Sequence, residues 1–373
     1  MAVPVTATLT VNGANFSFWE SVVVEREIGK PPTYATFEVA EQLNSTLTKG
    51  IASWRIGPGD AASVSLADQS VMSSAIVDMR QIYVDAGVHH VQIRVYSPVQ
   101  NVITSTVDAK PGQYTKSTFM QIAQAAANKV GVNVKLLGSP GGADKPFERV
   151  SESPGQSVFD FVSGLAMMRS LHMADDNDGN WVFFRGDTST SSTGLTLVEG
   201  QNILKARAIL ENNQLVPRVN TVGQNISNDE HWGQDAQDVS ASSQSQTQLT
   251  GIPAQRKQTL VMPLAGDKQD AQMYADHERS INELTSLHIV VTVPGWTCPD
   301  GSLWISKVGN NDVQTVTLNS PKIWPTNLGQ SQSVFLKGVR HLQNSSEGTV
   351  TELQLCNQAG LGGDHPVDAN PAG

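Results

Sequence analysis

The sequence predicts a protein of the α+β class that is mostly β, and three observations lead to this prediction. Short stretches rich in Val and Thr alternate between apolar and polar residues in the first third of the chain, and similar stretches return in its second half. Apolar residues at helical spacing occur mainly between these two regions. Only 16% of the 373 residues are charged, and this low share favours strands with polar but uncharged surfaces.

Residues 1–110 are predicted to form a first strand-rich domain. Residues 5–11 and 91–96 alternate, and residues 19–25 are rich in β-branched side chains. Turn signals such as Asn12-Gly13 and Gly57-Pro58-Gly59-Asp60 separate these stretches. Several short strands with regular turns are typical of a small barrel or a sandwich.

Residues 111–190 are predicted to form a compact α+β domain. Helical spacing over residues 119–130 predicts a helix, with Ser117 or Thr115 as its cap and Gly131 just past its end. A strand is expected at residues 132–136. Ser153-Pro154-Gly155-Gln156 has the pattern of a capping box with proline at the first helical position, so a second helix is expected to begin there. The buried face of that helix is predicted to contain Val158, Phe161, Val162 and Leu165.

Residues 191–356 are predicted to form a second strand-rich domain with one helix at 267–285. A loop at 344–348 is expected to join the last two strands as a hairpin. Residues 227–250 are polar and low in complexity, which predicts a long mobile loop. The Gly/Pro-rich tail at 357–373 is expected to be disordered. The strands are expected near residues 203–208, 218–222, 288–293, 303–305, 313–318, 334–339 and 349–355.

The charge and the cysteines exclude several classes of function. The net charge is -10, and no cluster of Lys and Arg offers the concentrated positive charge that tight binding to phosphates needs. Cys298 and Cys356 are far apart and have no CxxC spacing, so a zinc knuckle and a redox motif are excluded, and free thiols are expected. No signal peptide and no apolar run of about 20 residues is present, so neither secretion nor membrane insertion is expected.

The stretch at residues 175–179, Asp-Asp-Asn-Asp-Gly, raises the question of a calcium loop. An EF-hand loop with Gly179 at its sixth position would place Ala174 at the first position and Arg185 at the twelfth, where oxygen ligands are required. The residues after Gly179 also have the pattern of a strand rather than a helix. Asn, Asp and Gly suit a turn with positive φ, so the stretch is predicted to be a hairpin turn.

Other motifs also fail to indicate catalytic, cofactor-binding or metal-binding residues, and none is predicted. No G-x-S-x-G elbow occurs, and the glycine-rich residues 138–142 lack the ending of a phosphate loop. His89 and His90 point to opposite faces of a strand, and His277 has no second histidine four residues on. Paired carboxylates for glycoside cleavage remain open, since the sequence carries no geometry. Among the tryptophans, Trp232 alone lies in a polar segment where exposure is expected.

Three parts of the chain carry a resemblance to a known family. A helix followed by a D-G-x-hydrophobic hairpin is formed by residues 154–161 and 178–185. A strand that leads to a tryptophan follows at residues 286–296. The closing strands correspond to residues 303–308, 316–321, 335–339 and 351–355. In this order the chain resembles the baseplate hub proteins of Mu-like contractile-tailed phages, the gpP family.

The resemblance implies a fold and a structural function. The expected fold has two barrel-like tube domains with the small α+β domain between them. The implied assembly is a homotrimer, a hub that joins the sixfold tail tube to the threefold spike and forms a channel for DNA. The implied partners are the spike protein, the tube or tube-initiator protein and other baseplate proteins, while DNA passes without specific binding. No enzymatic activity, cofactor or metal is expected, and the implied location is the virion tail baseplate, assembled in the host cytoplasm.

Two other functions are weighed against this one. A tail-associated peptidoglycan hydrolase would need a lytic domain, and the predicted domains leave no segment for it. A cell-surface-binding tail protein would need exposed aromatic residues, of which Trp232 is the one candidate.

Overall fold

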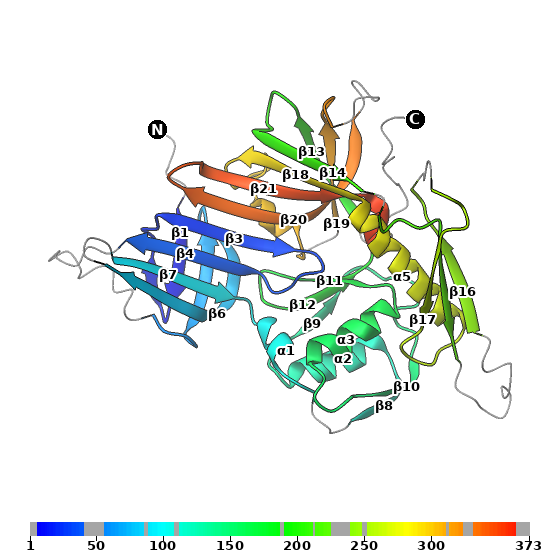
Figure 1. The fold of residues 1–373 in the computed structure, drawn as a ribbon. Coiled ribbons are helices and arrows are strands. Elements are labelled where there is room, and N and C mark those ends of the chain that lie inside the picture. Colours follow the sequence, from blue (N-terminus) through cyan, green and yellow to red (C-terminus); the bar gives the residue numbers. More distant parts are fainter. Residues whose placement is uncertain are drawn as a thin grey trace.

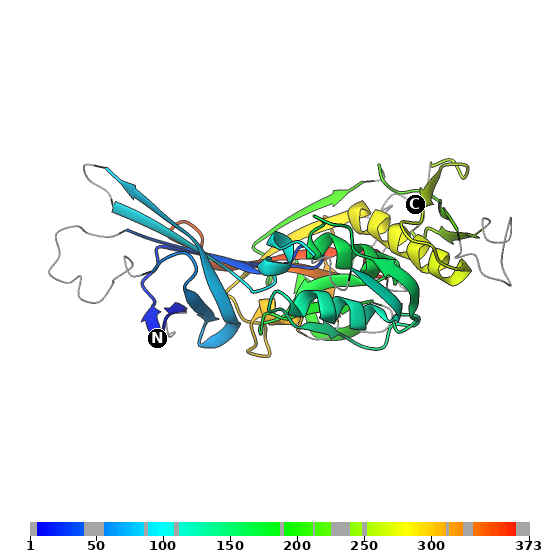
Figure 2. The same cartoon turned by 90° about the horizontal axis from the view of Figure 1, so that it is seen from below.

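The computed structural model describes residues 6–40, 56–85, 89–107, 112–186, 190–211, 213–224, 239–247, 252–310, 313–323 and 331–362. The described part is mostly β, as the sequence predicts, and its largest sheet has 13 strands. Figure 1 shows this sheet crossing the molecule, with a helical layer beside it. Seen from below in Figure 2, the strands form one elongated end and the helices gather at the other.

The N-terminal strands form one half of the large sheet. Their burial alternates strictly, as in β1 and β4, because one face of the sheet covers the core and the other is half-exposed. The strands are β1 (Ala7–Val11), β2 (Ala14–Phe16), β3 (Ser21–Glu27), β4 (Tyr34–Ala40), β5 (Ala61–Leu66), β6 (Gln69–Val84) and β7 (His89–Tyr96).

The helical layer follows directly after β7 and has its own apolar core around Phe119, Phe161 and Trp181. A three-stranded sheet, β11-β12-β9, lies between this layer and the large sheet. The elements are α1 (Gln100–Thr104), β8 (Gln113–Ser117), α2 (Phe119–Asn128), β9 (Val134–Leu136), β10 (Phe147–Ser151), α3 (Val158–Met167), β11 (His172–Asp175) and β12 (Trp181–Phe184).

The C-terminal part completes the large sheet and adds a separate three-stranded sheet, β16-β15-β17, that packs on a long helix. Its strands are β13 (Thr190–Val198), β14 (Lys205–Leu210), β15 (Arg218–Gly223), β16 (Val239–Gln244), β17 (Lys257–Val261), β18 (Leu287–Pro294), β19 (Val313–Asn319), β20 (Gln332–Asn344) and β21 (Gly348–Cys356). Its helices are α5 (Lys268–Ser286) and the short 3-10 helices η2 (Trp304–Lys307) and η4 (Gln358–Leu361).

The expected arrangement of two barrels is not confirmed, since no sheet within the described residues is closed. The physical reason lies in β20, whose first residues pair with β19 while residues 338–343 pair with β3 after a bulge. This single strand therefore joins the N-terminal and C-terminal strands into one sheet, in the order β14-β18-β21-β20-β3-β4-β7-β6-β5-β1-β2. The predicted domain boundaries stay a prediction.

The observed N-caps of two helices differ from the predicted ones. The segment 153–156 forms a turn, in which the Gln156 N–H donates to the Ser153 carbonyl, and α3 begins at Val158 with Ser157 as its N-cap. Gly155 adopts a φ of 84°, which excludes it from an α-helix and explains why the expected capping box is not used. Thr118, rather than Ser117 or Thr115, caps α2. The helix predicted at 267–285 is present as α5, with Asp267 as its cap.

Three predictions about strands and loops were wrong in part. Residues 304–307 form η2 instead of the strand expected at 303–305. Within the loop expected at 227–250, residues 239–244 form strand β16, while residues 227–238, including Trp232, lie outside the described residues. The start of the tail expected to be disordered folds as η4, whose four residues are buried, and residues 363–373 lie outside the described part.

Candidate functional site

The acidic stretch at residues 175–179 is a hairpin turn, and it also forms a polar junction between three parts of the chain. It joins β11 to β12, with Gly179 at a φ of 77°. The buried Asp175 carboxylate accepts hydrogen bonds from the Thr33 backbone N–H (2.8 Å), the Thr33 hydroxyl (2.7 Å) and the Ser97 hydroxyl (2.5 Å). Its Oδ1 lies 3.8 Å from Nε of Arg26, a side chain that is fully buried.

Asn177 extends this junction to the C-terminal strands. Its Oδ1 accepts from Arg26 Nη1 (2.7 Å) and from Asn310 Nδ2 (3.0 Å). Arg26 Nη1 also donates to the carbonyls of Ile305 and Val308, near η2. The first strands, the β11–β12 hairpin and the η2 segment therefore meet at one buried guanidinium.

Donors of the protein itself engage the carboxylate of Asp176. One of its oxygens accepts from the backbone N–H groups of Asp178 and Asn180, and the other accepts from Lys135 Nζ at 2.6 Å. Burial would raise the pKa of Asp176, but the hydrogen bonds from Lys135 and Asn180 outweigh burial and hold that pKa below its ordinary value. The carboxylate oxygens that a cation would need are already occupied by protein donors.

Buried histidine and serine side chains lie together near α5. His172 and His277 have ring centroids 5.2 Å apart, and the Ser280 Oγ lies 3.4 Å from His172 Nε2. The Ser280 hydroxyl donates to the His277 carbonyl at 2.7 Å and is 1% exposed, so no substrate reaches it. Burial lowers the pKa of His277 to about 4.

The two cysteines and the histidines of β7 were the other candidates for chemistry in the sequence. Cys298 and Cys356 are free and buried, and burial raises their pKa values to about 11 and about 12, so the reactive thiolate is scarce. His90 lies half-buried on β7, and the side chain of His89 is outside the described residues. Among the residues that the structure describes, no group of three His, Cys, Asp or Glu side chains is arranged to hold a metal. None of its helices is long and apolar enough to cross a bilayer.

The most extended functional candidate is the outward face of the large sheet. Eight of its strands, β14-β18-β21-β20-β3-β4-β7-β6, are antiparallel throughout. One face of these strands carries the apolar core, and the other presents polar and charged side chains. A single transverse row on that outward face crosses all eight strands and consists of Lys205, Thr292, Glu352, Arg340, Glu25, Tyr34, Tyr96 and Ile76.

Both margins of this eight-stranded segment have unpaired strand edges within the described residues. β14 pairs with β18 alone, and β6 beyond residue 77 pairs with β7 alone. Such edges expose backbone N–H and C=O groups that can pair with a strand of another chain. Figure 1 shows β14 and β6 apart from each other, with other strands of the large sheet between them.

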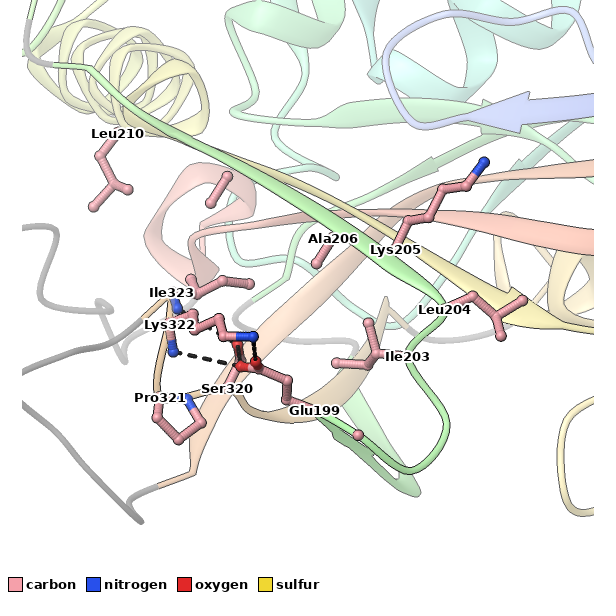
Figure 3. Close-up of a pocket in the computed structure, with 12 residues that line it drawn as sticks. Glu199, Ile203, Leu204, Lys205, Ala206, Leu210, Ser320, Pro321, Lys322 and Ile323 are labelled. Carbon is pink, nitrogen blue, oxygen red and sulfur yellow. Dashed lines mark hydrogen bonds and ion pairs between the residues drawn. The ribbon is translucent and has the colours of Figure 1, made fainter.

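A groove of about 830 Å³ lies against the core-side face of β14 (Figure 3). Its floor includes Ala206, Ala208 and Leu210 of β14, and its opposite wall is formed by residues 199–203 and 320–323. Glu199 holds that wall together, since it accepts from the Ser320 hydroxyl (2.7 Å) and pairs with Lys322 Nζ (2.6 Å). Periodicity predicted a strand here, but only the tertiary structure shows that its edge is open and that a groove lies against its core-side face.

Comparisons with known proteins define the class to which these features correspond. Residues 6–97 match the family described as Mu phage baseplate assembly protein GpP-like, N-terminal, and residues 100–185 match baseplate hub protein gp44-like, second domain. The predicted resemblance to the baseplate hub proteins of Mu-like phages is therefore confirmed.

Individual relatives agree with this class. The chain is 23% identical to the baseplate hub protein gp44 of Escherichia phage Mu over 360 residues, which cover 95% of this chain and 89% of that protein. Its fold is similar to the 43 kDa tail protein of prophage MuSo2 from Shewanella oneidensis (TM-score 0.77, 18% identity, 95% of this chain and 99% of the other). It is also similar to a tail protein from Neisseria meningitidis MC58 (TM-score 0.75, 16% identity, 97% and 99%). These findings support a structural protein of the baseplate hub type of a Mu-like phage.

Proposed function

We propose that three copies of this chain form a homotrimeric hub in the baseplate of a contractile tail, which joins the sixfold tail tube to the threefold spike and encloses a channel for DNA. The observation that carries this proposal is the eight-stranded segment with an open edge at each margin. β14-β18-β21-β20 come from the C-terminal half and β3-β4-β7-β6 from the N-terminal half. Three chains therefore present six four-stranded units, which suits an adaptor between sixfold and threefold partners.

The geometry of β14 supports pairing between neighbouring copies. The Glu211 N–H donates to the Ser286 carbonyl, and the register with β18 then directs the N–H groups of residues 205, 207 and 209 toward β18. The N–H groups of Ala206, Ala208 and Leu210 therefore point to the open edge. A strand placed along the open edge of β14 finds regularly spaced donors and acceptors there.

The far end of β6 supplies a matching strand. Ile82 and Val84 are 48% and 58% exposed, although they lie on the side of the sheet that elsewhere carries the core. In a sheet that continues from β6 of one copy to β14 of the next, these two side chains can lie on the same face as Ala206, Ala208 and Leu210, which line the groove. A head-to-tail contact of this kind closes into a ring if the rotation between copies closes.

The remaining features of the proposal concern partners and location. The ring binds the spike on its threefold side, the tube or tube-initiator protein on the other side, and further baseplate proteins around it. The chain has no enzymatic role in this proposal, because the buried histidines, cysteines and Ser280 are inaccessible to substrate. The virion baseplate is its location after assembly in the host cytoplasm.

The mass of the purified chain in solution, measured by light scattering, tests the proposal. Three chain masses at micromolar concentration are expected, and the mass should not change with moderate dilution. A chain that stays monomeric up to the highest attainable concentration, and also in the presence of its spike protein, would contradict the trimeric hub.

A further inference from the structure

We infer that the outward face of the eight-stranded segment is kept from binding DNA by carboxylates that occupy its cations, with Arg340 as the central case. This inference rests on the proposed function and adds to it that the outward face lines the proposed channel. It adds a mechanism: the face is not depleted of positive charge, but its positive charges are engaged by groups of the same chain.

Arg340 lies in the middle of the transverse row and is held from both sides. Its Nη1 is 3.2 Å from Glu352 Oε2 on β21, and its Nε is 3.5 Å from Glu25 Oε2 on β3. Arg340 is 39% exposed, so it is accessible from the face, and yet two flanking strands each place a carboxylate on it. The Tyr34 hydroxyl donates to Glu25 at 2.6 Å and fixes this carboxylate beside the guanidinium.

The same arrangement recurs at other cations of the face. Arg94 donates to Asp78 from Nη2 (2.7 Å) and Nε (3.0 Å), and this contact raises the pKa of Arg94. Lys337, near the β20 bulge, pairs with Glu27 at 2.7 Å, and Lys205 pairs with Glu347. Arg207, on the edge strand β14, is the exception among these cations, since no carboxylate contact with it is found in the described residues.

The physical consequence concerns a polyanion that moves along this face. A phosphate that contacts Arg340 must displace two carboxylates that are already positioned, and their negative charges remain beside it and repel it. A free arginine would instead release counterions from DNA and hold the phosphate. Alternating charges across the strands therefore let the face stay polar and hydrated while offering DNA few places to bind.

The test compares DNA binding by variants that differ in which cations are freed. Glu25→Gln with Glu352→Gln keeps the shape of both side chains and frees Arg340. The probe is a fluorescent 15-base-pair duplex, and its anisotropy is measured against protein concentration at several salt concentrations. The wild-type protein is expected not to bind, and the double variant to bind at low salt. The slope of log K against log salt should increase by roughly one for each arginine that reaches a phosphate.

A matched control separates the position of the charges from the net charge. Asp178→Asn with Asp300→Asn changes the net charge equally and removes exposed carboxylates beside Lys135 and Lys307, which lie off this face, so no DNA binding is expected. Adding Arg340→Gln to the first double variant should abolish its binding. The inference is overturned if the folded E25Q/E352Q protein binds no better than the wild type, or no better than the control.

The same samples distinguish this inference from the proposed function. If the double variant misfolds, as judged by its melting curve, the more exposed single variant Glu352→Gln is measured against Asp300→Asn with the same expectation. DNA binding by the freed variant, together with a wild type that stays monomeric also in the presence of its spike protein, would support the masking of Arg340 and overturn the trimeric hub. If the wild type is trimeric and the freed variant does not bind DNA, the trimeric hub is supported and the masking of Arg340 is overturned.

Discussion

At the scale of single residues, the most informative feature is the group of polar side chains around Arg26. A fully buried guanidinium is costly unless its charge and donors are matched, and here Asp175, Asn177 and Thr33 match them. These partners come from segments far apart in the chain. The acidic turn was predicted correctly as a turn, but its partners could not be found by periodicity, since nothing local in the sequence distinguishes Arg26 from a surface residue of an alternating strand.

We expect Asp175→Ala to destabilise the fold by about 3–5 kcal/mol, because it leaves Arg26 buried without its carboxylate and removes the acceptor of Thr33 and Ser97. Urea unfolding followed by circular dichroism measures this change. Asp178→Ala, in the same turn but with a side chain that is 69% exposed, should cost less than about 0.5 kcal/mol. Equal losses for the two variants would contradict the structural role assigned to Asp175.

Buried histidines give the protein an acid sensitivity with a definite sign. Burial holds the pKa of His277 at about 4, whereas an unfolded histidine titrates near 6.5. As the pH falls, the unfolded state therefore binds the proton first. Neutral His277 leaves the free energy of unfolding unaffected above pH 6.5, and that free energy decreases as the pH falls from 6.5 toward 4. The loss amounts to about 1.4 kcal/mol per pH unit within this window.

The variant His277→Phe should make the stability of the protein less dependent on pH between 6.5 and 4.5. In the wild type, the Nδ1 atom of His277 is buried without a hydrogen-bond partner. The phenyl ring therefore removes the titrating imidazole without breaking a hydrogen bond at that atom. Urea midpoints at pH 7.5, 6.0 and 5.0 measure the effect. Identical slopes for the variant and the wild type would show that His277 is not a source of the acid sensitivity.

At the scale of elements, α5 shows how a polar segment becomes ordered. Glu283 is fully buried, and its carboxylate accepts from the Gln246 N–H (2.7 Å) and the Thr247 hydroxyl (3.1 Å). Arg279 bridges Glu283 and the Ser243 hydroxyl. The apolar positions of α5 predicted a helix correctly. Polar side chains of α5, which helical spacing does not assign to partners, anchor β16 and the residues after it within the segment predicted to be a mobile loop.

The open edge of strand β14 can be tested by removing one of its backbone N–H groups. Ala206→Pro removes an N–H that points to the open edge, so the hydrogen bonds between β14 and β18 are retained and the monomer should keep its fold. The variant should lose the trimeric mass in light scattering, while Ala206→Thr, which keeps the N–H, should retain it. A folded A206P protein with an unchanged trimeric mass would rule out pairing at this edge.

At the scale of the whole molecule, the strand-rich halves are parts of one sheet. The order of strand-rich, α+β and strand-rich segments was predictable, because alternation and helical spacing are local properties. Their union through β20 and β3 was not, because a bulge at residues 336–338 lets one strand change partners along its length. The expectation of two barrel-like domains came from the resemblance to the hub proteins, and the sequence left open whether the first domain takes strands from the region after residue 190.

The sequence by itself determined the mostly β class, the positions of most strands, the helix α5, the turn at residues 175–179 and the resemblance to baseplate hub proteins. These depend on patterns within short windows and on family motifs. Only the tertiary structure decided which strands share the large sheet, which edges stay open, and how Arg26 and Arg340 acquire their carboxylates. Those contacts join residues separated by many positions along the chain, and neither propensity nor periodicity carries information at that range.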